Sequence, residues 1–218
     1  MACIDRKPEV LGNSPERIYV TDANRRDENV RRHVARYEFA ARHIPAGARV
    51  LDCACGSGYG TELLARLVPD SYVLGVDRSY DAIGYAQLHH WSDRTYYLLG
   101  SVEKQRHVGL GALVTLETLE HLHPCNCQEF LRDAARWIKP GGVLVASSPM
   151  LRCRDGVPYV TSPYHVNEMP RYELLAMFAE VFPPPEWVLH YYHQVQEAFV
   201  PLLDEDEGFC VVVGRKKR

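Results

Sequence analysis

The feature that most constrains this chain is the stretch from residue 50 to residue 60, which reads VLDCACGSGYG. An apolar run leads to Asp52, a glycine-rich turn follows, and an amphipathic segment at residues 61–68 leaves the turn. Glycine lets the backbone approach a bound molecule closely, and the start of a helix presents unpaired N–H groups to it. The pattern predicts a strand, a tight loop and a helix start that together bind an adenosine-type cofactor.

Strand-like and helix-like segments alternate along the rest of the chain. Apolar runs predict strands at residues 49–54, 71–77, 95–100, 113–116, 143–148, 187–192 and 209–213. Apolar residues at three- and four-residue steps and helix-capping residues predict helices at residues 28–43, 59–68, 79–90, 126–138 and 170–182. This alternation is typical of α/β proteins with a doubly wound parallel sheet.

Size and charge exclude several classes of protein. A chain of 218 residues fits one domain. The net charge of -3 argues against a nucleic-acid binder, which usually has a basic excess. No apolar run approaches the roughly 20 residues that cross a bilayer, and the charged first 20 residues do not resemble a signal peptide. We therefore expect a cytoplasmic protein whose seven cysteines are thiols. The sequence does not choose between a monomer and a dimer.

The ends of the expected strands are the places to look for a ligand site, because doubly wound sheets bind ligands there. Acids or hydroxyls stand at the first five of these ends: Asp52, Asp77, Ser101, Glu117 and Ser148. A carboxylate at Asp77 could accept both hydroxyls of a ribose. The dinucleotide pattern G-x-G-x-x-G is not met, because Thr61 stands where the third glycine is required. A nicotinamide-dependent oxidoreductase is therefore disfavoured.

Several motifs, in order and at the right spacing, resemble class I S-adenosylmethionine-dependent methyltransferases over about residues 15–215. The loop at residues 52–58 is similar to the acid-x-Gly-x-Gly-x-Gly loop of that family, with Ala54 in place of a glycine. The motifs VDRS, GSVE, LETLEHL and IKPGG resemble those that follow it, at residues 76–79, 100–103, 116–122 and 138–142. Residues 33–40 and 163–168 are similar to a subgroup associated with sugar and cell-surface polysaccharide biosynthesis.

The resemblance implies a Rossmann-like, mostly parallel, seven-stranded sheet whose last strand is antiparallel. It implies one methyltransferase domain over residues 1–218, with residues 1–45 as an N-terminal cap and residues 149–170 as a loop on the acceptor side. S-adenosylmethionine would be the methyl donor and S-adenosylhomocysteine the product. The acceptor would be a small molecule or a glycan-type sugar, with no role for a membrane.

The same resemblance assigns the cofactor site residue by residue. The residues that it implies are Arg36, Tyr37, Asp52, Ala54, Gly56, Gly58, Asp77, Arg78, Ser101, Val102, Glu103 and Glu117. Asp77 would hold the ribose, residues 101–103 would bracket the adenine, and the backbone near Glu117 would receive the methionine ammonium. Arg36 could pair with the methionine carboxylate, because its planar fork matches two oxygens. The alternative for Arg36 is an ion pair on the surface of the first helix.

Methyl transfer requires an acceptor that is held in line with the reactive methyl group, and a hydroxyl acceptor also benefits from a base. His121 and His165, both beyond strand ends, are the candidate catalytic bases; each could instead serve packing or fix a loop. Two available bases favour O-methylation slightly over N-methylation. A nucleic-acid or protein acceptor, or a non-catalytic S-adenosylmethionine-binding module, are the alternatives.

An alternation of histidine and cysteine at residues 121, 123, 125 and 127 raises the question of zinc. The spacing departs from the gaps of about two to four residues that separate paired zinc ligands. Alternate residues of a helix also point in different directions. No metal site is therefore expected from the sequence.

Overall fold

The computed structural model describes residues 17–218, so residues 1–16 of the expected N-terminal cap lie outside the described residues. Its main sheet has eight strands in the order β3-β2-β1-β4-β5-β10-β8-β9. In chain order these are β1 (Arg49–Cys53), β2 (Tyr72–Asp77), β3 (Thr95–Leu99), β4 (Leu110–Leu116), β5 (Ile138–Met150), β8 (Trp187–Val195), β9 (Ala198–Pro201) and β10 (Gly208–Lys216). The first five are parallel, and β10 runs antiparallel to both of its neighbours. The doubly wound fold with an antiparallel last strand is confirmed.

The strand count differs from seven because a short edge strand, β9, returns antiparallel along β8. The turn between them passes through Gln196, whose φ is 55°. A second difference concerns β5, which begins at Ile138 rather than at residue 143. Leu110 pairs with Ile138 and Ala112 pairs with Val143, so the KPGG segment at residues 139–142 forms a bulge within β5.

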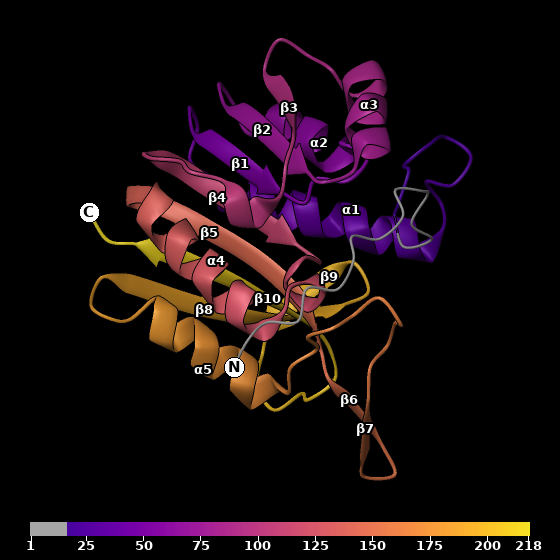
Figure 1. Ribbon diagram of the computed structural model, residues 1–218, viewed down its shortest axis with the longest axis vertical. Coiled ribbons are helices and arrows are strands. Elements are labelled where there is room, and N and C mark those ends of the chain that lie inside the picture. The colour runs from indigo at the N-terminus through magenta and orange to yellow at the C-terminus, as the bar shows by residue number, and fades with distance from the viewer. Residues whose placement is uncertain (1–16) are drawn as a thin grey trace.

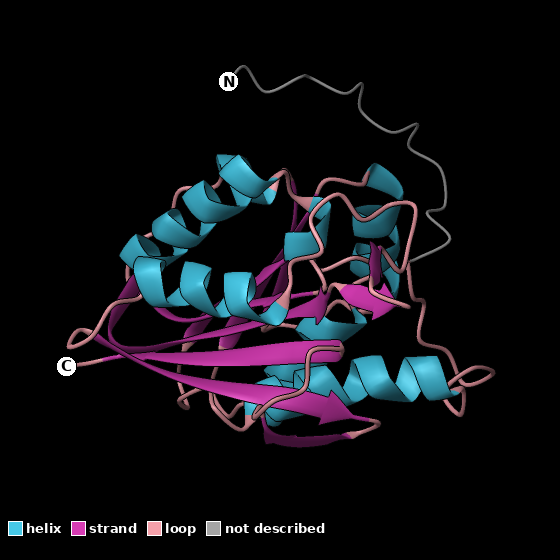
Figure 2. Ribbon diagram, turned by 90° about the horizontal axis from the view of Figure 1, so that it is seen from below, coloured by secondary structure: helices cyan, strands magenta, loops and turns pink. Residues whose placement is uncertain are grey.

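Five helices cover the two faces of the sheet (Figure 2). They are α1 (Glu28–Ala41), α2 (Tyr59–Leu67), α3 (Tyr80–His89), α4 (Pro124–Trp137) and α5 (Arg171–Val181). One core cluster joins α1 and α2 to the sheet, and the other joins α4 and α5 to the opposite face. Every residue of β4 is buried, as expected for a parallel strand covered on both sides.

Two local features explain why α3 and α2 begin where they do. The Ser79 hydroxyl accepts a hydrogen bond from the Ala82 amide at 3.3 Å and so caps α3. At Gly60, a Cβ atom would lie 2.0 Å from the Tyr37 ring. Only glycine fits there, because α2 begins directly against α1.

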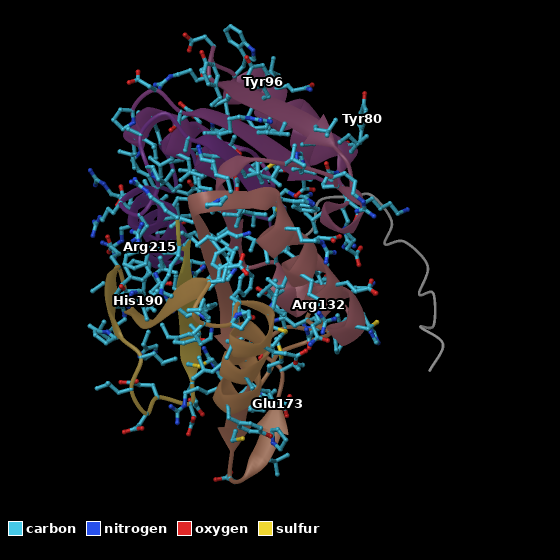
Figure 3. The ribbon with its side chains drawn as sticks, turned by 90° about the vertical axis from the view of Figure 1, so that its left-hand side faces the viewer. Tyr80, Tyr96, Arg132, Glu173, His190 and Arg215 are labelled. Carbon is cyan, nitrogen blue, oxygen red and sulfur yellow. The ribbon has the colours of Figure 1, made fainter. Side chains whose placement is uncertain are left out.

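The ends of the molecule differ in what they expose. At the β3 edge, Tyr96 and the nearby Tyr80 of α3 are more than half exposed and project from the same end of the molecule (Figure 3). The hairpin of β6 (Arg152–Arg154) and β7 (Val157–Tyr159) extends away from the main body (Figure 1). Within residues 17–218 no helix has the length and apolar character of a membrane span. The six cysteines of the same range form no disulfide.

Candidate active site

A cavity of about 430 Å³ lies where the strand ends meet α1. Ten of the twelve residues expected to bind the cofactor line it: Arg36, Tyr37, Ala54, Gly56, Asp77, Arg78, Ser101, Val102, Glu103 and Glu117. Of the two candidate bases, His121 lines the cavity. His165 does not line it, but its ring centre lies 4.9 Å from that of His121. The sequence motifs therefore converge on one enclosure.

Asp52 and Gly58 do not line the cavity, which differs from the expectation. The Asp52 side chain is fully buried and accepts hydrogen bonds from the Thr61 hydroxyl at 2.6 Å and the Tyr37 hydroxyl at 3.3 Å. Gly58 has a φ of 89°, and a Cβ atom there would lie 2.5 Å from the Ala86 side chain. Asp52 therefore contacts α1 and α2, and Gly58 lies against α3.

Burial raises the pKa of Asp52 to about 7. The hydrogen bonds from Thr61 and Tyr37 oppose this shift, and the nearby Asp77 carboxylate adds to it. Desolvation dominates because a carboxylate with only two hydroxyl donors is poorly compensated for lost water.

Asp77 joins the first loop to the second. Its Oδ2 accepts the Gly56 amide at 2.9 Å, and its Oδ1 accepts the Ser79 amide at 2.8 Å. The Arg17 guanidinium lies 3.8 Å from Oδ1. Each carboxylate oxygen has two lone pairs, so Asp77 can still accept hydroxyl groups from the cavity side.

Glu103 lies beyond the end of β3, on the short helical turn η1 (Val102–Lys104). Its two oxygens accept from the Asn126 side chain at 2.6 Å and from the Ser101 hydroxyl at 3.1 Å. These contacts fix residues 101–103 as one wall of the cavity. The sequence motif predicted the wall but not the contribution of Asn126, which comes from α4.

Arg36 is buried, so the alternative of a surface ion pair is wrong. Its Nε donates to Gln194 Oε1 at 2.5 Å, and its Nη1 lies 3.4 Å from Glu117 Oε2. The guanidinium carbon lies 4.2 Å from the centre of the Phe209 ring. Glu117 also accepts from the Ser147 hydroxyl at 2.7 Å. Its positive φ of 53° is a conformation that non-glycine residues adopt mainly where the surrounding structure enforces it.

The histidines belong to a second group of contacts beyond Glu117. His121 ends the short turn η2 (Leu119–His121), and its Nδ1 lies 3.3 Å from the Tyr164 carbonyl oxygen. His165 Nδ1 lies 2.5 Å from Glu168 Oε1, and the two imidazole centres are 4.9 Å apart. Tyr164 lines the cavity, so the loop at residues 149–170 contributes to its wall.

Backbone hydrogen bonds lock these segments together. The amides of Val166 and Asn167 donate to the Glu120 carbonyl oxygen at 2.8 and 3.0 Å. The Asn167 side chain donates to the Leu119 carbonyl oxygen at 3.4 Å. The turn that follows β4 is therefore clamped to the distant loop that carries His165.

Sequence reasoning missed two titratable residues. Glu120 is only 1% exposed, and neither of its carboxylate oxygens has a hydrogen-bond partner among residues 17–218. Burial, and then the Glu117 charge, raise its pKa well above the usual range. His33 lines the cavity, and burial followed by Arg36 and Arg32 lowers its pKa to about 3. The spacing E-x-x-E-H at residues 117–121 could have signalled Glu120, because it brings two acids and a histidine to one strand end.

Comparison with known proteins agrees with this geometry. Residues 50–142 match the family described as methyltransferase domain. A probable S-adenosylmethionine-dependent methyltransferase of Mycolicibacterium smegmatis is 29% identical over 147 residues, which are 66% of this chain and 54% of that protein. A ubiquinone biosynthesis O-methyltransferase of Xanthomonas axonopodis pv. citri is 34% identical over 114 residues, or 50% of this chain and 46% of that one.

Solved structures extend the likeness in fold beyond the matched residues. The plantazolicin methyltransferase BpumL, solved in complex with SAH, matches with a TM-score of 0.68 at 13% identity, over 89% of this chain and 87% of that chain. The chain spans about half the length of the curated relatives described above. Residues 50–142 are therefore similar to the methyltransferase domain family, and the chain shares the fold of the solved methyltransferase BpumL.

Proposed function

We propose that this chain transfers the methyl group of S-adenosylmethionine to an oxygen atom of a small-molecule acceptor. The observation that carries the proposal is the continuity of one cavity, whose wall includes Asp77 and Glu103 as well as His121 and Tyr164. A cofactor held by the first pair would direct its sulfonium toward the second pair. Methyl donor and acceptor would then share one enclosure, which supplies the proximity and orientation that the displacement needs.

The polar residues of the cavity suit the charges of the cofactor. Asp77 would accept the ribose hydroxyls with the lone pairs that Gly56 and Ser79 leave unused. The pair of buried Arg36 and half-buried Glu117 offers one charge of each sign. The amino acid part of S-adenosylmethionine is a zwitterion, so its carboxylate would meet the guanidinium and its ammonium would meet the Glu117 side.

Three observations favour a small acceptor and an oxygen target. The cavity has the size of an ordinary small-molecule site. The net charge of -3 provides no general attraction for nucleic acid. The Xanthomonas relative is named for O-methylation in ubiquinone biosynthesis. His121, on the cavity wall, would receive the hydroxyl proton as the carbon–oxygen bond forms. A glycan-type acceptor belongs to the same class and remains within the proposal.

The test is to incubate the full chain with methyl-labelled S-adenosylmethionine and a panel of acceptors, and to detect labelled products by mass spectrometry. The panel contains hydroxylated aromatic compounds and quinols, free and nucleotide-linked sugars, a structured RNA and a peptide mixture. Label on a hydroxyl of a small compound is the expected result, and Asp77→Asn should reduce it. Asp93→Asn, which changes an exposed acid, is the matched control.

Two results would contradict the proposal. Label on the RNA or the peptides would support a macromolecular acceptor instead. Tight binding of S-adenosylmethionine without transfer to any member of the panel would favour a module that binds the cofactor without catalysis.

A further inference from the structure

The strongest unexplained feature is a cluster of three side chains, of which one, His121, lines the cavity. One ligand-capable atom each of Glu120, His121 and His165 lies within 4.8 Å of the others. His121 and Glu120 come from the turn after β4, and His165 comes from a loop more than 40 residues later. The backbone hydrogen bonds between Glu120 and residues 166–167 hold the two segments in this register. The cluster is therefore built by the fold rather than by neighbours in sequence.

The Glu120 carboxylate is the first independent sign of a missing ligand. Its side chain is buried, and neither oxygen has a hydrogen-bond donor within the described residues. A buried carboxylate without a partner is strongly unfavourable, because it loses its water and gains nothing in exchange. A bound cation would supply the missing partner for both oxygens.

The orientation of the two imidazoles is the second sign. The Tyr164 carbonyl oxygen can only accept, so His121 Nδ1 carries the hydrogen of their contact. His165 Nδ1 likewise faces the Glu168 carboxylate, which also accepts from the Thr161 amide at 2.8 Å. Metal-binding histidines almost always donate one ring N–H to a carbonyl or a carboxylate, and they bind the ion through the other nitrogen. Nε2 is the nitrogen that this arrangement assigns to an ion on both rings.

We propose that Glu120, His121 and His165 bind a divalent transition-metal cation at the acceptor end of the cavity. The donor set of one carboxylate and two imidazoles suits Mn²⁺, Fe²⁺, Co²⁺ or Zn²⁺ better than Mg²⁺, which prefers oxygen ligands. Three protein ligands leave coordination positions for water or substrate.

The role of the ion rests on the proposed function. An acceptor hydroxyl that binds the ion loses its proton to water more readily, because the cation stabilises the resulting oxyanion. That oxygen attacks the methyl carbon of the sulfonium, the new carbon–oxygen bond forms, and the sulfur–carbon bond breaks with its electron pair going to sulfur. The products are the methylated acceptor, S-adenosylhomocysteine and one proton. In the chain that holds the ion, His121 and His165 act as ligands, and water takes the place of His121 as the proton acceptor.

The site differs from the histidine and cysteine alternation at residues 121–127. His123 and Cys125 are exposed, while Cys127 is buried and its sulfur lies 3.9 Å from that of Met177. His123 Nδ1 lies 3.1 Å from Cys125 Sγ, so these two exposed side chains contact each other, while Cys127 lies in the core. His123 provides a matched control, because it is a histidine two residues from His121 that the proposed site does not use.

The test measures cation binding alone, on the full chain after treatment with a chelator and without cofactor or acceptor. Mn²⁺ and Zn²⁺ are titrated separately, by electron paramagnetic resonance for Mn²⁺ and by calorimetry for both. At least one of them should bind with one ion per chain, and Glu120→Gln, His121→Gln and His165→Gln should each weaken that binding more than about tenfold. Glu168→Gln should weaken it about 10- to 100-fold, as is typical for a partner of a ligating histidine. His123→Gln should bind as the unaltered chain does.

Circular dichroism and binding of S-adenosylhomocysteine establish that each variant is folded. The proposal is overturned if neither ion binds, or if the three ligand variants bind as tightly as His123→Gln. Full methyl transfer by the metal-free chain would also overturn it while leaving the proposed function intact. Cation binding that follows this pattern, in a chain that transfers no methyl group, would count against the proposed function and not against the site.

Discussion

The two ends of the cavity are built in different ways. At the cofactor end, Asp77 binds amides that are 21 and 2 residues away in the sequence, within consecutive strand–loop–helix units. At the acceptor end, His121 contacts Tyr164 across 43 residues, and the Val166 amide donates to the Glu120 carbonyl oxygen. The cofactor end is thus specified by short motifs, whereas the acceptor end depends on segments that meet only in the folded chain.

The two ends also differ in how their carboxylates are satisfied. Both oxygens of Asp77 accept backbone amides, but neither oxygen of Glu120 has a hydrogen-bond partner in the part of the chain that the structure describes. A satisfied carboxylate gives a preformed site for a fixed ligand, while an unsatisfied one marks a position that another species completes. Different parts of the fold therefore bind the cofactor and the acceptor.

The largest expected effect is at Arg36, where the two ends join. Arg36→Ala should lower the free energy of unfolding by about 3 kcal/mol, because it leaves Glu117 without its buried partner. Arg31→Ala, which removes an exposed pair with Glu197, should cost less than about 1 kcal/mol. Urea unfolding of both variants makes the comparison, and equal losses would show that Arg36 is not a buried link.

Next in size is His121, which separates the two ends functionally. His121→Ala should lower turnover about 100-fold, whether the ring acts as a base or as a ligand, since both roles serve the acceptor oxygen. Its affinity for S-adenosylhomocysteine should stay within about threefold, because Asp77 and residues 101–103 are untouched. Steady-state kinetics and calorimetry give the two values, with His123→Ala as the control. Unchanged turnover would rule His121 out of the acceptor chemistry.

A pH effect on stability should come from Asp52, behind the cofactor end. Burial raises its pKa to about 7, so the folded chain keeps this proton at pH values where the unfolded chain has lost it. Its contribution to stability is complete below the ordinary pKa of an aspartate and is lost as pH rises through about 7. Relative to the parent chain, Asp52→Asn should therefore gain about 2 kcal/mol between about pH 5 and about pH 8.

Urea unfolding at the two pH values checks this expectation in the absence of cofactor. Asp93→Asn, on the surface, should show no such difference between the two pH values. A parallel pH profile for Asp52→Asn and the parent chain would mean that Asp52 is ionised in the folded protein.

The smallest of these effects concerns the cofactor end alone. Asp77→Asn should weaken binding of S-adenosylhomocysteine about tenfold, because an amide oxygen is a weaker acceptor for hydroxyls than a carboxylate. Turnover at saturating cofactor should change much less than it does in His121→Ala. Calorimetry on Asp77→Asn and Asp93→Asn provides the comparison. If Asp77→Asn lost turnover but kept its affinity for S-adenosylhomocysteine, Asp77 would belong to the acceptor end and not to the cofactor end.

The sequence predicted the residues that line the cavity around Asp77 because their motifs are local. Ser79, Asp77 and the loop at residues 52–60 act through neighbours that the strand–helix alternation already brings together. The edge strand β9 escaped prediction because its four residues, AFVP, are too few to show a period. Glu120 escaped because burial of an acid depends on residues 166–167, whose approach no short pattern reveals. The sequence predicted that Arg36 lies at the cavity. Its contacts with Gln194 and Phe209 could not be predicted, because they depend on the register of β8 and β10.

The most direct test of the account is a calorimetric titration of the full chain with S-adenosylhomocysteine, followed by one with NAD. One S-adenosylhomocysteine should bind per chain, S-adenosylmethionine should compete with it, and NAD should give no heat of binding. Binding of NAD in preference to S-adenosylhomocysteine, or no binding of S-adenosylhomocysteine, would contradict the claim that this cavity holds the methyl donor.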